Sequence, residues 1–374
     1  MKILHTGDVH LDSPFAGLDT SAARQRRSEL RETFASMTTY AREGGVDLML
    51  IAGDLFDKNY VTRDTIALLR REFAKLDCPV VIAPGNHDPA EEKSIWEKNI
   101  FSDNVFVFSS ADLSYFSFPQ LRCRVYGYAF PGPSLRTCPL EGRRIEDASW
   151  INILCAHGDA TSPISTYGPL PAGVLEAFGA DYCALGHFHN PENATAALTV
   201  LGAYCGCPEG RDFGETGSKG AILVSLEKDE KGARLSWERL RFCRKIYETR
   251  TLNIDGAAQQ EEVAAAVHTL IQKENFDKDT LLRITLQGNI ESNLSIDTTA
   301  LEASGAELAH LEVRDATVPT WNAAALLQDQ GMRGELYRVL LPKLESADPA
   351  ERETGSRALR YAMAALAGEE LPAD

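Results

Sequence analysis

Short apolar runs that end in polar residues recur along the first 245 residues of the chain. Such runs are typical of buried strands, and the clearest are KILHTGD, VDLMLIAGD, PVVIAPGNHD, INILCAHGD and DYCALGHFH. Apolar residues at helical spacing between them predict helices over Ser21–Glu43 and Thr62–Leu76. We therefore expect an α/β sheet whose ligands lie at the carboxyl ends of its strands.

Two later stretches have the pattern of antiparallel strands. They are Leu121–Phe130 and Lys219–Leu240, and the second turns back near Lys231 and Gly232. Antiparallel strands beside parallel ones predict a mixed sheet arrangement. The expected fold class is α/β, a β-sandwich flanked by helices, followed by a small α+β domain and a helical C-terminal tail.

The pattern changes after Lys245, where elements become shorter and more widely spaced. The sequence predicts a helix over Ala257–Glu274, a strand over Thr280–Gln287, a weak helix over Thr298–Ala303 and a strand over Glu307–Val313. These elements form a small α+β domain. Beyond Pro319, two helices are predicted over Trp321–Leu344 and Pro349–Leu366.

The first of these terminal helices is unusually apolar. Its apolar side chains are Leu326, Leu327, Leu336, Val339, Leu340 and Leu341. An isolated terminal helix cannot bury such a stripe, so it needs a partner surface in this chain or in another.

The composition is that of an ordinary globular protein, with 44% hydrophobic and 25% charged residues among 374. The net charge is −16, of which −5 falls in residues 1–245 and −11 in residues 246–374. This balance excludes nucleic-acid binding through overall positive charge, so any phosphate must be held locally. The sequence shows no apolar stretch of membrane-spanning length and no secretory signal pattern, which predicts a cytoplasmic protein with no membrane association.

The eight cysteines are scattered, and several lie in apolar strand-like runs. This distribution favours buried free thiols. Cys205 and Cys207 form a C-x-C pair, but no second pair at zinc-finger spacing stands nearby, so a zinc site there is not expected.

Five motifs at predicted strand ends carry the candidate chemistry. They are Asp8-Val-His10, Gly53-Asp54, Gly85-Asn86-His87-Asp88, His157-Gly158 and Gly186-His187-Phe188-His189. Any one of them alone is more often a turn or a core histidine. Together they hold five of the eight histidines, and the D-x-H and H-x-H spacings put both members of each pair on one side of a strand.

A mixture of carboxylate, carboxamide and imidazole donors suits Mn²⁺, Fe²⁺ or Zn²⁺ rather than Ca²⁺ or a thiolate-selected metal. Seven ligands for two ions imply a bridging carboxylate, for which Asp54 is the best candidate. Phosphoester hydrolysis is a reaction that such metal pairs perform.

The ordered set D-x-H, GD, GNHD, H and GHxH resembles the calcineurin-like metallophosphoesterase superfamily. Within it, the sequence is most similar to the SbcD-type nucleases of DNA double-strand-break repair, in their YhaO-like branch. The segments that carry this likeness are HTGDVHLDSPFAGL, AGDLFD, PGNHDP and GRDFGETGSKG. The likeness is good over about residues 1–245. It rests only on position along the chain in the next domain, and it is weak in the tail.

The resemblance implies a role for each matching residue. One metal would be held by Asp8, His10, Asp54 and His189, and the other by Asp54, Asn86, His157 and His187. His87 would be the catalytic residue that protonates the leaving oxygen or stabilises the transition state, and Asp88 would orient it. Some relatives have a second histidine after GDLF, whereas this chain has Asp57, which argues against a second catalytic imidazole.

The resemblance further implies three domains. They are a metallophosphoesterase (nuclease) domain at 1–245, an α+β capping and DNA-binding domain at 246–318, and a partner-docking helical tail at 319–374. The expected activity is that of a two-metal-dependent DNA exonuclease or endonuclease, with manganese as the expected metal and Mg²⁺ as a further candidate. Its expected partners are DNA, an SbcC-like coiled-coil ATPase and a second copy of the chain.

Two other functions remain open at this point. A small-molecule or cyclic-nucleotide phosphodiesterase would use the same metal site, although such enzymes usually lack so long a C-terminal extension. A non-catalytic scaffold is disfavoured because every ligand position is filled. The charge of −16 counts against DNA binding, and only the clusters Arg24–Arg31 and Arg241–Lys245 offset it, the first of which could equally be a solvated helix face.

Overall fold

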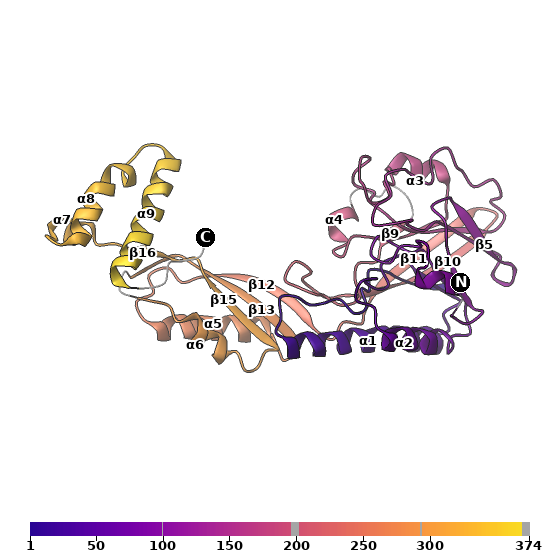
Figure 1. Cartoon of the computed structure of the whole chain (residues 1–374), viewed down its shortest axis with the longest axis horizontal. Helices are drawn as coiled ribbons and strands as arrows, with labels where there is room; N and C mark the ends of the chain where they lie inside the picture. Colours follow the sequence, from indigo (N-terminus) through magenta and orange to yellow (C-terminus); the bar gives the residue numbers. More distant parts are fainter. Residues whose placement is uncertain (99, 196–201, 292–293, 369–374) are drawn as a thin grey trace. The chain divides into compact units, whose positions relative to one another are not determined.

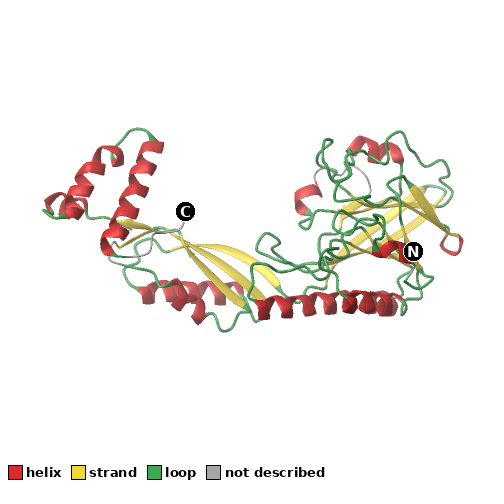
Figure 2. Ribbon diagram, viewed as in Figure 1, coloured by secondary structure: helices red, strands yellow, loops and turns green. Residues whose placement is uncertain are grey.

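The structure is a computed structural model that describes residues 1–98, 100–195, 202–291 and 294–368 (Figures 1 and 2). Its contacts divide the chain into two compact units, Met1–Tyr247 and Glu248–Asp374. Each unit is described separately below.

The first unit contains two sheets, of which the larger has six strands in the order β11-β10-β1-β2-β3-β4. Their bounds are β1 Lys2–Thr6, β2 Leu48–Ile51, β3 Val80–Ile82, β4 Val105–Val107, β10 Gly220–Asp229 and β11 Gly232–Arg241. Strands β1 to β4 run parallel, whereas β10 pairs antiparallel with both β1 and β11. The antiparallel pair predicted over Lys219–Leu240 is therefore confirmed.

The second sheet has five strands in the order β5-β6-β7-β8-β9. Their bounds are β5 Ser114–Phe118, β6 Cys123–Gly127, β7 Ile151–His157, β8 Tyr182–Gly186 and β9 Gly202–Tyr204. Only β5 and β6 pair antiparallel, and β6 to β9 are parallel. The segment Leu121–Phe130 thus supplies one strand that joins an antiparallel pair to a parallel series.

Side-chain alternation along the strands builds the layers. Leu48 and Leu50 of β2 belong to a core that also includes Ile153 from β7, so this core lies between the two sheets. The intervening Met49 and Ile51 join a different core, made with the helices on the outer face. A strand covered on both faces is apolar throughout, which explains the unbroken hydrophobic runs in the sequence.

Helices cover both outer faces of this sandwich (Figure 1). Helices α1 (Thr20–Glu43) and α2 (Arg63–Phe73) pack on the first sheet, and α3 (Ala172–Phe178) packs on the second. The Asp19 side chain caps α1 by accepting from two backbone N–H groups of its first turn. The short elements are α4 (Glu192–Thr195) and the 3₁₀ helices η1 (Ile95–Lys98) and η2 (Pro119–Leu121).

The second unit begins with an α+β region. Its strands are β12 Ile246–Asn253, β13 Thr280–Gln287, β14 Asn289–Glu291, β15 His310–Asp315 and β16 Val318–Thr320, and its helices are α5 Gln260–Glu274 and α6 Thr298–Ser304. One sheet has the order β12-β13-β15, and β14 pairs with β16. Val263, Val267 and Ile271 recur every four residues along α5 and form the core against the sheet. Strand β12 was missed at the sequence level because exposed and half-buried residues interrupt its pattern.

Up to residue 368, the C-terminal region contains three helices, not the two predicted. They are α7 Ala323–Gln328, α8 Met332–Leu344 and α9 Pro349–Ala367. The predicted helix over Trp321–Leu344 was wrong in its continuity, since it breaks between Gln328 and Met332. Asp329 there accepts the Gly331 N–H at 2.6 Å, which is the local side-chain-to-backbone competition that ends helices.

The mixed α/β fold class, with sheets flanked by helices and a helical C-terminus, is confirmed. Seven of the eight cysteines are buried, and all eight are free thiols, as the sequence predicted. None of the helices in the described ranges combines the length and apolar character needed to cross a membrane.

Candidate metal centre

The five motifs meet where the parallel strands of the two sheets end. The expected ligands follow these ends in order: Asp8 and His10 after β1, Asp54 after β2, Asn86 after β3, His157 as the last residue of β7, and His187 and His189 after β8. Parallel strands place their carboxyl ends at one edge of a sheet, so residues nearly 180 positions apart become neighbours.

Two glycines allow the sheets to approach closely at this edge. A Cβ atom at Gly53 would collide with the ring of His157, and one at Gly85 would collide with the Asp54 carboxylate. Gly53 also has a φ of 88°, which few other residues adopt readily. The small residues in the Gly-Asp and Gly-Asn-His-Asp motifs are therefore required for the ligands to meet.

The backbone is strained at the site. Asp8, His10 and Asp54 have φ values of 48°, 48° and 51°, and His187 has a φ of 120°. Non-glycine residues in such conformations cost on the order of 1–3 kcal/mol each, and they cluster at functional sites. The chain thus holds these side chains in place at the expense of its own stability.

The hydrogen bonds of His157 indicate a binding site for a cation. Its Nδ1 lies 2.9 Å from the carbonyl oxygen of Ala52, and a carbonyl only accepts, so Nδ1 donates. In the neutral ring, Nε2 then carries a lone pair. That lone pair faces Oδ1 of Asn86 at 3.0 Å and Oδ2 of Asp54 at 3.4 Å. Three converging acceptors suit a bound metal ion.

His10 and His189 repeat this arrangement. Nδ1 of His10 lies 2.9 Å from Asp57, and Nδ1 of His189 lies 2.6 Å from Glu215. Each carboxylate favours the tautomer that donates from Nδ1. The two Nε2 atoms lie 3.1 Å apart. Burial would lower the pKa of His189, but its hydrogen bonds with Asp8 and Glu215 raise the pKa to about 9, so the surroundings of this ring favour a positive charge, which a bound metal ion would supply. Arg211 contacts both His189 and Glu215 at 2.7 Å and neutralises that carboxylate.

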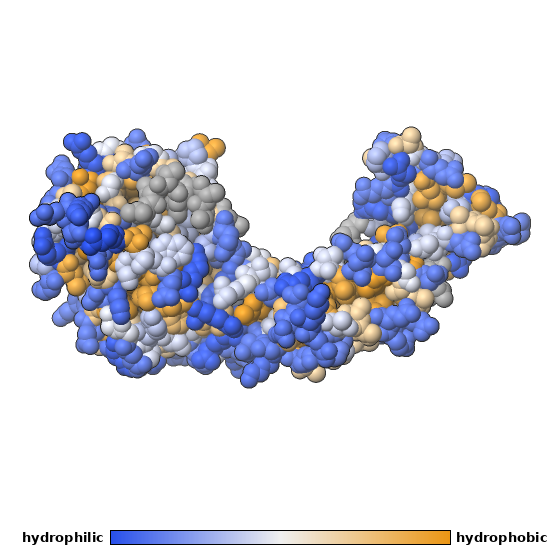
Figure 3. Space-filling view, turned by 180° about the vertical axis from the view of Figure 1, so that it is seen from behind, coloured by the Kyte–Doolittle hydropathy of each residue, from blue (hydrophilic) through white to orange (hydrophobic). Residues whose placement is uncertain are grey.

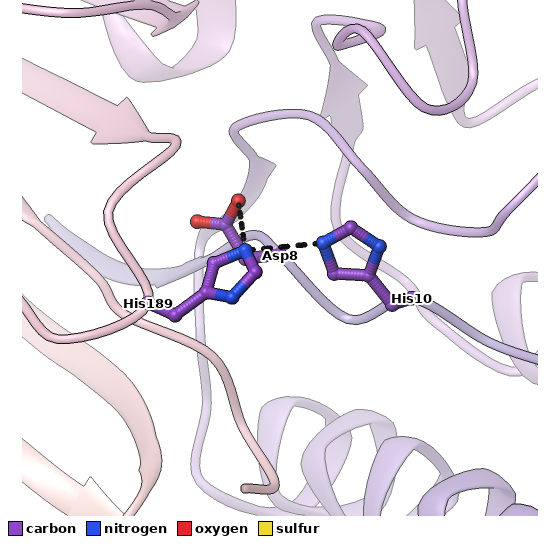
Figure 4. A group of neighbouring side chains, drawn as sticks. All are labelled: Asp8, His10 and His189. Atoms are coloured by element: carbon purple, nitrogen blue, oxygen red, sulfur yellow. Dashed lines mark hydrogen bonds and ion pairs between the residues drawn. The ribbon is translucent and has the colours of Figure 1, made fainter. Parts of the chain in front are cut away.

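Asp8 completes this group, as Figure 4 shows. Its Oδ1 lies 3.5 Å from Nε2 of His189 and 4.0 Å from Nδ1 of His157. Asp8 is fully buried, and burial alone would raise its pKa, but the hydrogen bond with His189 and nearby imidazoles hold the pKa below its usual range. Its carboxylate is therefore charged and available as a ligand.

Within the described residues, three sets of side chains lie close enough to hold an ion. They are Asp8 with His10 and His189, His10 with Asp54 and His87, and Asp8 with Asp54 and His157. His10, Asp54 and Asp8 are each shared between two sets. The geometry brings together six of the seven expected ligands, if Asn86 is counted through its contact with His157.

His187 lies beside this group but belongs to none of the three sets. Its backbone N–H donates to Oδ2 of Asp8 at 2.9 Å. Its ring centroid is 5.3 Å from those of His157 and Tyr167. Burial lowers the pKa of His187 to about 4, which keeps the ring neutral. Metal binding by His187 stays a prediction.

His87 differs from the other histidines in being accessible. Its side chain is 49% exposed, whereas that of His10 is fully buried. Nδ1 of His87 lies 2.8 Å from Oδ1 of Asp57, the same atom that contacts His10. This contact with Asp57 raises the pKa of His87, which favours a ring that can donate a proton.

The expected role of Asp88 requires a correction. Its carboxylate accepts from three backbone N–H groups, those of Gly85 (2.7 Å), Leu55 (2.7 Å) and Asp54 (3.1 Å). Burial, and then the charge of Asp54, raise the pKa of Asp88 to about 7. Asp88 therefore holds together the loops that carry Asp54 and His87, while the carboxylate that orients His87 is Asp57.

Sequence reasoning missed three residues that support the ligands. Asp57 holds His10 and His87, and Glu215 with Arg211 holds His189. Asp57 lies in AGDLFD, and the other two lie in GRDFGETGSKG, segments already noted for their likeness to a family. An acidic residue in such a segment was the available signal, but its partner could not be read from spacing.

The parallel strand ends and the cation-demanding donor set define a metal-dependent phosphoesterase, and this chain belongs to the calcineurin-like phosphoesterase family, which it matches over residues 1–191. Members of this family bind divalent metals and hydrolyse phosphoesters.

Among individual proteins, the chain is similar to the uncharacterized metallophosphoesterase YhaO of Bacillus subtilis (strain 168). The two are 29% identical over 304 residues, which cover 77% of this chain and 72% of that protein. The chain also resembles the crystal structure of TT1561 of Thermus thermophilus, with a TM-score of 0.37 and 13% identity, over 64% of this chain and 99% of the other.

Proposed function

We propose that this chain is a two-metal-dependent DNA nuclease that acts in DNA repair with an SbcC-like coiled-coil ATPase. The observation that carries the hydrolytic part is the half-exposed His87 beside a buried group of converging acceptors. The likeness of the chain's motifs to those of SbcD-type nucleases supports DNA as the substrate. Mn²⁺ is the proposed metal, with Fe²⁺, Zn²⁺ and Mg²⁺ as alternatives.

Each residue has a distinct task in this proposal. One ion would be held by Asp8, His10, Asp54 and His189, and the other by Asp54, Asn86, His157 and His187. When bound, such a pair would make the attacking water more acidic and would neutralise charge on the phosphoryl oxygens. His87, oriented by Asp57, gives its proton to the leaving oxygen.

Two of the four arginines in the cluster Arg24–Arg31 on α1 form ion pairs within the chain. Arg26 is 4% exposed and contacts Glu29 and Glu209, and Arg31 contacts Asp12. Their charge is used within the chain. In the proposal, the ATPase partner contributes much of the positive surface that binds DNA.

The C-terminal helices supply the proposed docking surface for that partner. Leu326, Tyr337, Leu359 and Met363 form a small core among them. Other apolar side chains on these helices remain exposed: Leu327, Met332, Val339 and Leu366. Figure 3 shows hydrophobic atoms, in orange, on the surface of this part of the chain. A group of three helices that already has a core, yet exposes apolar residues, suits attachment to a coiled coil. A homodimer is part of the same proposal.

A small-molecule or cyclic-nucleotide phosphodiesterase is the second candidate. The specific observation in its favour is that Arg26 and Arg31 are used in ion pairs within the chain, with Glu209 and Asp12 respectively. The chain as a whole has a net charge of −16. Small phosphodiesters need no extended basic surface.

One experiment separates the two functions. The purified protein is loaded with Mn²⁺ and given end-labelled DNA and a chromogenic phosphodiester in parallel, with and without chelator. Chelator-sensitive DNA cleavage that His87→Gln reduces supports the nuclease. Hydrolysis of the small ester alone, with intact DNA even when the ATPase is added, favours the second candidate.

A further inference from the structure

A cavity of about 690 Å³ lies in the first unit, next to the loop that carries His87. Its walls come from the loop after β2 and the loop after β3, which also carry Asp57 and His87. Lys58, in one wall, donates its backbone N–H to the His87 carbonyl at 3.0 Å, and Asp88 lies in the lining. The cavity therefore lies beside His87, the residue proposed to protonate the leaving oxygen, although His87 is not itself part of the lining.

One side of the cavity is aromatic and rigid. The ring of Trp96 stacks on Phe56 with a centroid distance of 5.0 Å and an angle of 28°. Its Nε1 donates to the Asp88 carbonyl at 2.6 Å, which fixes the orientation of the indole. Phe56 is 2% exposed, whereas Trp96 is half-buried, so the indole is the ring available to a ligand. Flat, sequence-tolerant surfaces of this kind bind nucleobases by stacking.

The rest of the lining is rich in cations. It contains Lys58, Arg63, Lys93 and Lys98, against Glu91 and the backbone-bonded Asp88. Lys58 pairs with Glu91 at 2.7 Å, and Lys93 is 4.0 Å from Glu92. Arg63 and Lys98 have no ion-pair partner among the described residues. An excess of positive charge in a chain of net charge −16 suits a ligand that carries phosphate.

We propose that this cavity binds one nucleotide of the polynucleotide substrate, the one adjoining the scissile phosphate. Its base stacks on Trp96, and its flanking phosphate contacts Arg63 and Lys98. The proposal rests on the nuclease function proposed above and adds where the strand lies beside the metal centre. Packing alone does not explain why an oriented indole lies beside two cations that have no ion-pair partner in the described part of the chain.

Equilibrium binding tests the phosphate contacts without hydrolysis. The probe is a fluorescent single-stranded oligodeoxynucleotide, followed by anisotropy in the presence of chelator. Arg63→Gln with Lys98→Gln should raise Kd roughly tenfold and reduce the slope of log K against log salt by about 0.7, the value for one neutralised phosphate of a single strand. The matched control is Arg70→Gln, an exposed arginine on the same helix but outside the cavity, which should keep the parent Kd.

Stacking is tested at Trp96. Trp96→Leu should weaken binding of the oligodeoxynucleotide roughly 5- to 100-fold, whereas Trp96→Phe should restore most of it. An oligonucleotide with abasic sites should bind the parent and the leucine variant alike. Indole emission should be quenched by the probe in the parent and less so in Trp96→Phe. Melting temperatures identify any variant that has lost its fold, and the phenylalanine variant then carries the test.

The outcomes distinguish the cavity from the function. If the parent cleaves DNA, but the Arg63, Lys98 and Trp96 variants bind the probe as the parent does, the cavity inference is wrong and the nuclease function stands. If the parent hydrolyses a small phosphodiester but neither binds nor cleaves the oligonucleotide, the nuclease function fails. If an acidic peptide displaced the fluorescent probe but the unlabelled oligonucleotide did not, the cavity inference would also be overturned.

Discussion

The two units of the chain differ in the polar side chains that they bury. The first unit buries charged and ionisable groups, and Asp8, His10, Asp54 and His157 are at most 2% exposed. In the described part of the second unit, the buried polar side chains are only Thr280 and Thr317. Both units expose large apolar side chains, such as Ile164 at 88% in the first, but in the second unit four of them lie on the C-terminal helices, among them Met332 at 70% and Val339 at 66%.

This difference has an energetic explanation. A buried carboxylate or imidazole is costly unless it is paired, so the first unit gives up stability to hold a preorganised set of acceptors. An exposed apolar side chain costs little in the folded chain but makes a surface available for association. Chemistry is therefore expected from the first unit and interaction from the second.

The sharpest test of the first unit is His87→Gln. We expect the hydrolysis rate to fall about 10²–10⁴-fold, the usual contribution of a general acid, while the bound metal remains. Rates on a chromogenic phosphodiester and metal content by mass spectrometry measure the two effects. If metal and activity are lost together, His87 is a ligand, as its proximity to His10 and Asp54 would then explain.

The second unit is tested by Leu359→Ala, in the core of the C-terminal helices, where the side chain is 2% exposed. The variant should lower the local free energy of unfolding by about 2–5 kcal/mol, since it removes buried methyl groups and leaves a cavity. The matched control, Val339→Ala on the exposed surface, should stay within about 0.5 kcal/mol of the parent. Hydrogen exchange of residues 323–367 measures both. Equal effects would mean that these helices have no core of their own.

Metal removal should act on one unit only. Binding to the folded state stabilises it by about 2.7 kcal/mol at a concentration 100 times Kd. Chelation should therefore lower protection from hydrogen exchange in Met1–Tyr247, and most clearly in the loops after β1 and β2. Protection of Glu248–Asp374 should not change. A uniform loss over both units would contradict the assignment of the ions to the first unit.

Asp57→Asn should have a smaller effect than loss of His87 itself. The substitution keeps an acceptor but removes the charge that orients both His10 and His87. Loss of such a partner typically costs about 10- to 100-fold in metal affinity or activity. Metal titration and rate measurements test this, with Asp64→Asn, an exposed carboxylate on α2, as the control. A variant indistinguishable from the parent would leave Asp57 with a structural role only.

Much of the site could be predicted because its residues lie in short motifs. The strand ends that carry Asp8, Asp54 and His157 are visible as breaks in apolar runs, and the structure brings those residues together. The partner of His87 could not be predicted in the same way. Asp88 is its neighbour in sequence, but the turn directs the Asp88 carboxylate to backbone N–H groups. The carboxylate that contacts the His87 ring is that of Asp57.

Arg26 illustrates the same limit for charge. In the sequence it is one of several arginines in a helix, equally suited to a solvated face or to DNA. In the fold it is buried against Glu209, which lies 183 positions later. No local pattern encodes that contact.

The sequence by itself determined most of the strands and helices, the metal-binding residue types and the order of the motifs, because periodicity and strand-end motifs are local properties. Only the tertiary structure decided which carboxylate orients which imidazole, which arginines are buried, and where a cavity adjoins the catalytic loop. The physical reason is distance. Hydrogen bonds and ion pairs form over about 3 Å between atoms, and only the packing of the two sheets brings groups from residues 8, 57, 87, 189 and 215 that close.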